Sequence, residues 1–197
     1  WTGGMVRGGV RASSRVGTVA GVRGGIDANI SAETGYVARV AAVRGDVAGS
    51  ITAGGPIYNV TAAGGDMLAD LRTTGGSESG IHRVVARDLS TGGTVRGSIR
   101  SSGPIGSVAA VGGDLDLSSS RVTAGSSIGS LQAIGGSIRG DGDNATKEVT
   151  VSGGNLGRMR AIRGDIDGVA VDVEASAHGR TGRIGRVEAL GSPTGIT

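Results

Sequence analysis

The chain has 197 residues, of which 41 are Gly, 3 are Pro and none is Cys, and its formal net charge is +3. The absence of Cys excludes disulfides and thiolate chemistry, and Gly outside strict third positions excludes collagen. No apolar run approaches ~18 residues, so no membrane-spanning segment is predicted. Basic and acidic residues are interspersed and aromatic residues are scarce, which argues against nucleic acid as a partner.

A pattern of about 20 residues recurs along the chain and consists of two alternating halves. The first, half A, places two apolar residues four positions apart. Its clear copies are Val6/Val10, Ile26/Ile30, Val47/Ile51, Met67/Leu71 and Val95/Ile99. Later copies, which start at Leu115, Ile138 and Ile166, loosen this spacing. A repeat of fixed period is typical of stacked architectures, in which no unit buries its apolar face alone.

The second, half B, carries apolar residues at its first, fourth and seventh positions and a small residue at its sixth. Seven copies follow this rule: Val16/Val19/Val22, Val37/Val40/Val43, Ile57/Val60/Ala63, Ile105/Val108/Val111, Ile128/Leu131/Ile134, Leu156/Met159/Ile162 and Ile184/Val187/Leu190. An eighth copy, Ile81/Val84, breaks the rule at Arg87. We expect the flanking residues of each copy to lie at bends.

Spacings of three and four also occur in helices, but Gly recurs within every ten or so residues, and each interior Gly costs a helix about 1 kcal/mol. Short strands joined at glycine corners fit the composition better. The sequence therefore predicts an all-β fold, a parallel β-solenoid (β-helix) of about eight coils in a single domain, 1–197. No polar capping helix is predicted at either end, which favours a segment of a longer repeat protein.

The links between the halves differ. The link from B to A is nearly constant and reads RGG, RGD, GGD or GGS, which is typical of a tight turn; RDLSTGG (87–93) is an insertion in it. The link from A to B lengthens at 73–80, 118–126, 140–154 and 172–182. Loops that vary on a fixed scaffold often form its binding edge, so we look for function at 140–154 and 172–182.

Three RGD tripeptides could indicate adhesion to a receptor. We interpret the copies at 44–46 and 163–165 as turn residues, because GGD occupies the same position at 64–66 and 112–114. The third copy, Arg139-Gly140-Asp141, lies off that position in a predicted loop. It is therefore the better candidate for display, and we add His178 and Arg180 of the last loop as ligand candidates.

Metal and catalytic chemistry have weaker signals. Asp141, Asp143 and Asn144 match the oxygen spacing at the start of a calcium loop, although Glu148 comes too early to complete it. Ca²⁺ is thus a possible ligand, and no other cofactor is predicted. No catalytic constellation is recognised. The alternative is a polysaccharide lyase or hydrolase that uses Asp141 and Asp143 with Arg180.

The coils 105–115, 127–138 and 155–166, with their G-x-I-x-x-V-x-A and GGD turns, resemble the Gly-rich β-solenoid repeats of large secreted bacterial surface proteins. The nearest are filamentous-haemagglutinin-like adhesins and autotransporter passenger domains. The resemblance implies a secreted or cell-surface, non-enzymatic stalk, adhesin rod or filament subunit. Its expected partners are other copies, joined head-to-tail or laterally through strand edges, and a host or cell-surface glycan or protein.

Overall fold

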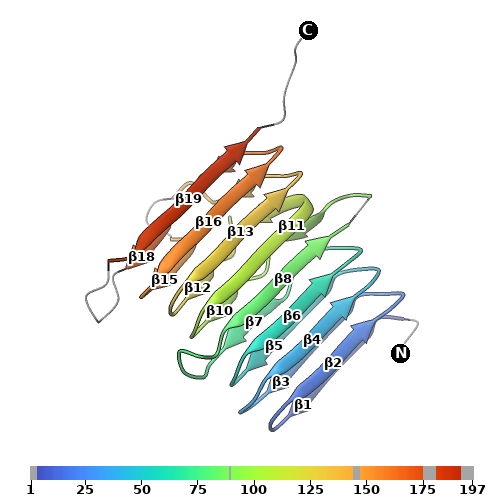
Figure 1. Ribbon diagram of the computed structural model, residues 1–197. Coiled ribbons are helices and arrows are strands. Elements are labelled where there is room, and N and C mark those ends of the chain that lie inside the picture. The colour runs from blue at the N-terminus through green and yellow to red at the C-terminus, as the bar shows by residue number, and fades with distance from the viewer. Residues whose placement is uncertain (1–3, 89, 144–146, 175–180, 192–197) are drawn as a thin grey trace.

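The computed structural model describes residues 4–88, 90–143, 147–174 and 181–191. These residues form an all-β fold in which the chain winds through parallel strands stacked along one axis (Figure 1). No helix among them could cross a membrane. The predicted parallel β-solenoid is confirmed. One sheet has eight strands and the main path of the other has eight, so the predicted number of about eight coils is confirmed as well.

Two sheets form the sides of the solenoid. The A sheet contains β1 (Val6–Ala12), β3 (Ile26–Ala32), β5 (Val47–Ala53), β7 (Asp70–Thr73), β10 (Ile99–Ser101), β12 (Val122–Ala124), β15 (Val149–Ser152) and β18 (Val171–Glu174). The B sheet contains β2 (Val16–Gly21), β4 (Val37–Ala42), β6 (Ile57–Ala62), β8 (Ile81–Arg87), β11 (Ile105–Asp116), β13 (Ile128–Ile134), β16 (Asn155–Ile162) and β19 (Arg183–Leu190). Each inner strand of a sheet pairs in parallel with its equivalents one coil before and after, and the first and last strands pair on one side only.

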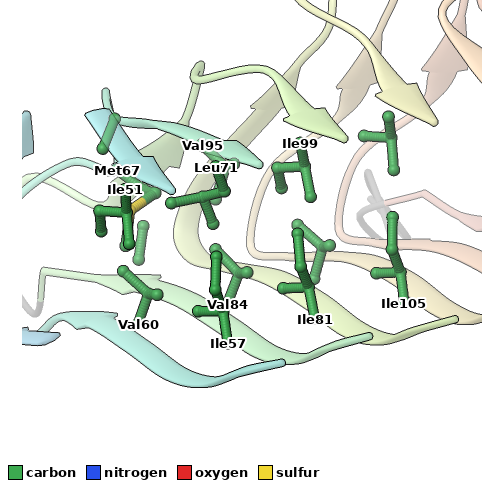
Figure 2. Close-up of a cluster of buried hydrophobic side chains, with 14 of the residues drawn as sticks. Ile51, Ile57, Val60, Met67, Leu71, Ile81, Val84, Val95, Ile99 and Ile105 are labelled. Atoms are coloured by element: carbon green, nitrogen blue, oxygen red, sulfur yellow. The ribbon is translucent and has the colours of Figure 1, made fainter. Parts of the chain in front are cut away.

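The core consists of ladders of small aliphatic side chains. On the B side, the first positions of half B stack in register from Val37 through Ile57, Ile81, Ile105 and Ile128 to Leu156, and all six are buried. Figure 2 shows Ile57, Ile81 and Ile105 following one another along the stack, opposite Leu71 and Ile99. Because each residue packs on a copy of itself, a narrow interior is filled without aromatic rings.

The seventh position of half B points outward. Val43 is 48% exposed, Ile134 36% and Leu190 44%, whereas the fourth and sixth positions, such as Val108 and Ala110, are buried in every inner coil. Side chains alternate between the two faces of a strand, so the fourth and sixth positions share the inner face and the seventh lies outside. The apolar residues at that position thus lie on the outer face, where they are half-buried or exposed.

Three of the four predicted loops contain strands of the A sheet. Strands β12, β15 and β18 lie within or overlap 118–126, 140–154 and 172–182. In these coils half A splits in two. Its first apolar residue lies on a third, narrow side with β9 (Gly93–Val95), β14 (Ile138–Arg139) and β17 (Ile166–Asp167), and its second follows a loop. The insertions in 118–126 and 140–154 therefore lie between two inward positions of half A, whereas the long link at 172–182 runs from β18 to β19, between A and B as expected.

Candidate functional site

The RGD tripeptide at 44–46 is part of the coil-to-coil hydrogen bonding. The Asp46 carboxylate accepts the backbone N–H of Asp66 at 2.8 Å, and the Asp66 carboxylate accepts that of Thr94, also at 2.8 Å. Gly45 has a φ of 127°, and a Cβ there would lie 2.7 Å from the Gly25 nitrogen. Gly and Asp at this turn are thus both explained by stacking.

The same arrangement continues in the later coils. The Asp114 carboxylate accepts the N–H of Ser137 at 2.7 Å, and the Ser137 hydroxyl accepts the N–H of Asp165 at 3.0 Å. In each of these coils the turn needs a short polar side chain that reaches the next coil, which explains why either Asp or Ser occupies this position. The tripeptide at 163–165 therefore sits in the same structural ladder as the one at 44–46.

The third tripeptide, Arg139-Gly140-Asp141, starts on a strand. Arg139 belongs to β14 and forms an ion pair with Asp114 at 3.4 Å. The N–H of Gly140 donates to the Asp167 carbonyl at 2.8 Å, and a Cβ at Gly140 would lie 2.0 Å from the Gly168 oxygen. Of the three residues, only Asp141 extends into the loop, so the structure does not present the tripeptide as one exposed unit.

Asp141 lies beside a buried carboxylate that the sequence interpretation discounted. The Asp141 carboxylate accepts the N–H of Asp143 at 2.7 Å, and this bond, followed by a hydrogen bond with the Glu148 side chain, holds the pKa of Asp141 below its usual range. Glu148 is buried, and its two oxygens accept the N–H groups of Asp141 at 3.1 Å and Ala170 at 2.7 Å. Glu148 therefore fastens the loop to the stack.

The predicted calcium and ligand residues are only partly placed. Asp141 and Asp143 are exposed on the same loop, whereas Asn144, His178 and Arg180 lie outside the described residues. Within the described ranges no group of three or more His, Asp or Glu side chains is arranged to hold a metal ion. The calcium site and the proposed cluster of Asp141 with Arg180 thus stay predictions.

A row of three aromatic rings lies at the corner that leads into the B sheet, and the sequence analysis did not predict that these rings are in contact. The ring centroids of Tyr36 and Tyr58 are 5.7 Å apart in an edge-to-face arrangement, and those of Tyr58 and His82 are 4.8 Å apart and tilted by 32°. Tyr58 and His82 each directly follow the first residue of half B, so the repeat itself was the signal that could have found the contact.

Comparisons with known proteins identify no relative: no family, no curated protein and no solved structure matches the chain. The fold and the contacts described above therefore carry the functional argument.

Proposed function

We propose that the chain is a non-enzymatic structural β-solenoid of an extracellular or cell-surface protein, acting as a stalk, an adhesin rod or a self-assembling filament subunit. The observation that carries this proposal is the continuous stacking of the same inward positions in every coil. Most carboxylates at the turns are used to bind the next coil, as at Asp46, Asp66 and Asp114. The extracellular setting rests on the resemblance of the repeats alone.

The edge of β19 supports association by adding strands. Among the described residues β19 pairs only with β16, so its other edge carries unpaired backbone groups. Its inward-facing Ile184 and Val187 are 48% and 52% exposed, whereas the equivalent residues of β16 are buried. A strand of the same pattern would continue these ladders, and exposed parallel edges favour such pairing.

Strand β2 of a second copy offers the matching pattern. Its Val16, Val19 and Gly21 occupy the positions that Ile184, Val187 and Ala189 occupy in β19. Head-to-tail stacking would therefore preserve the register of every B-side ladder across the junction.

The test is the state of assembly of the purified chain, measured by light scattering over a range of concentrations and by electron microscopy. We expect elongated, concentration-dependent assemblies that Val187→Asp prevents and Val43→Asp, a change on the side of the solenoid, does not. Compact monomers at all concentrations would refute self-assembly. Turnover of an acidic polysaccharide by the same preparation would refute the non-enzymatic part of the proposal.

A further inference from the structure

The outer surface of the B sheet, which we call the B face, is basic. The first seven half-B segments on this face contain no Asp or Glu; they are 16–22, 37–43, 57–63, 81–87, 105–111, 128–134 and 156–162. The same segments carry Arg39, Arg83, Arg87, Arg158 and Arg160. The A sheet differs, since its outward positions mix both signs, for example Asp70 beside Arg72. Positive charge is thus concentrated on one side of the solenoid.

Most of these arginines have no acidic partner in the described part of the chain. Arg39, Arg83 and Arg158 are exposed and form no ion pair there. Along the half-B segments of these strands, including 183–190 of the last one, the only acid is Glu188, which pairs with Arg160 and Arg186. Guanidinium groups left unpaired on an acid-free surface attract carboxylates, sulfates and phosphates, which they bind in a bidentate way.

Arg39, Arg83 and Arg158 lie in one row along the solenoid axis. Register places Arg39, Asn59 and Arg83 on successive strands, followed by Ser107, Ser130 and Arg158. At the usual strand separation, Arg39 and Arg83 are about 10 Å apart and Arg83 and Arg158 about 14 Å apart. The row therefore offers widely spaced cations with hydrogen-bonding side chains between them.

Aromatic rings lie on one side of this row of arginines, and hollows lie on the other. Tyr58 and His82 each directly precede a residue of the row, and Tyr58 is 43% exposed. On the other flank, a hollow of about 480 Å³ lies beside Arg39, lined also by Ala41 and Val43, and one of about 350 Å³ lies beside Arg83. Exposed Tyr combined with Arg is typical of recognition surfaces.

We propose that the B face binds a single chain of an anionic polysaccharide, laid along the solenoid axis, with Arg39, Arg83 and Arg158 on its acidic groups. Tyr58 and His82 form the apolar edge against which sugar rings pack. A second copy is a poor occupant, because its B face carries the same unpaired charge. Double-stranded DNA carries one charge per ~1.7 Å, a far higher density than this row offers, whereas acidic sugars interleave charged and neutral groups.

The test compares two pairs of unpaired arginines on opposite sides of the molecule. Arg39→Gln/Arg83→Gln removes two of the three arginines of the row, and Arg72→Gln/Arg100→Gln removes two adjacent arginines of the A sheet that also form no ion pair with any described residue. Binding of the purified full chain to polygalacturonate, heparin and neutral dextran is measured by calorimetry, and thermal melts verify that each variant is folded. Polygalacturonate carries carboxylates alone and heparin carries sulfates as well, so binding of heparin without binding of polygalacturonate would indicate sulfate recognition.

We expect binding to at least one anionic polymer and none to dextran, weakening as salt is added. The B-face pair should reduce the affinity by about tenfold or more, Tyr58→Ala should reduce it less, and the A-sheet pair should leave it unchanged. Equal losses from the two pairs, equal binding of dextran, or no binding to either anionic polymer would overturn the proposal. Tighter binding of oligo-deoxythymidine than of both anionic polymers would overturn it in favour of a nucleic-acid surface. All of these outcomes are independent of whether the chain self-assembles.

Discussion

The A and B sides of this solenoid respond differently to changes in chain length. On the B side, every strand from β2 to β19 keeps the same inward positions, and its partners stay in register. On the A side, Val47 and Ile51 share β5, but the equivalent Ile138 and Val149 are separated by a loop of variable length. Both pairs nevertheless continue the same ladders.

This difference shows where the architecture tolerates insertion. An inserted segment is harmless when it leaves the stack between two inward residues and returns in register, because the ladders above and below are undisturbed. The B side has no such point within its strands, since its inward residues follow one another at fixed spacing. We therefore regard the B side as the continuous spine and the A side as the place of variation.

The most severe test of the spine is a charge inside it. Val108→Asp places a carboxylate at a fully buried position of β11, without a partner, and should cost several kcal/mol of the free energy of unfolding. Val43→Asp, at an exposed position of the same repeat, should change it by less than about 0.5 kcal/mol. Chemical denaturation followed by circular dichroism measures both, and equal effects would show that the inward assignment is wrong.

A smaller effect is expected from the close approach of successive coils. Gly129 follows the first residue of half B, and a Cβ there would lie 2.4 Å from the Gly106 carbonyl oxygen. Gly129→Ala should therefore cost about 1–3 kcal/mol through strain. Gly17 holds the same position in the first coil with no atom within 4 Å, so Gly17→Ala should be neutral or stabilising. Thermal melts of the two variants that shift equally would contradict this reading.

The smallest effect concerns the one insertion between B and A, at 87–93. The Ser90 N–H, the Thr91 hydroxyl and the Ser90 hydroxyl donate to the Asp88 carboxylate and hold its pKa well below the usual range. A carboxylate whose pKa is lowered by folding stabilises the folded state at pH values above its ordinary pKa of about 4. This stabilisation is lost as the pH falls further. The difference in melting temperature between wild type and Asp88→Asn should therefore be constant between about pH 5 and 7.

Below about pH 4 that difference should shrink, as protonation removes the acceptor on which the turn depends. A difference that stays the same down to about pH 2 would mean that the Asp88 carboxylate does not hold the turn.

The repeat predicted the ladders but not which apolar residue leaves them. The spacing in half B marked Val108 and Val111 alike, and only strand alternation in the folded coil buries Val108 and leaves Val111 half-buried on the outer face. The strands β12, β15 and β18 were read as loops because their spacing from the preceding apolar residue varies. Their short V-x-A, V-x-V and V-x-V runs were visible in the sequence.

The candidate sites likewise include features that the sequence predicted and features that it did not. The turn position of the RGD copies at 44–46 and 163–165 followed from the comparison of coils, and the hydrogen bonds of Asp46 and Asp165 agree with it. The role of Glu148 did not follow, because its partners Asp141 and Ala170 come from different coils. Contact across coils is set by register, which spacing along the chain does not contain.

The sequence by itself determined the class of fold, since a period of about 20 residues with small β-branched side chains and glycine corners has few other solutions. The tertiary structure decided which residues share a surface. Arg39 and Arg83 are far apart in the sequence, and only the stacking of β4, β6 and β8 places them two strands apart on one acid-free face. A periodic sequence fixes the coil, whereas the neighbours of each side chain depend on how the coils align.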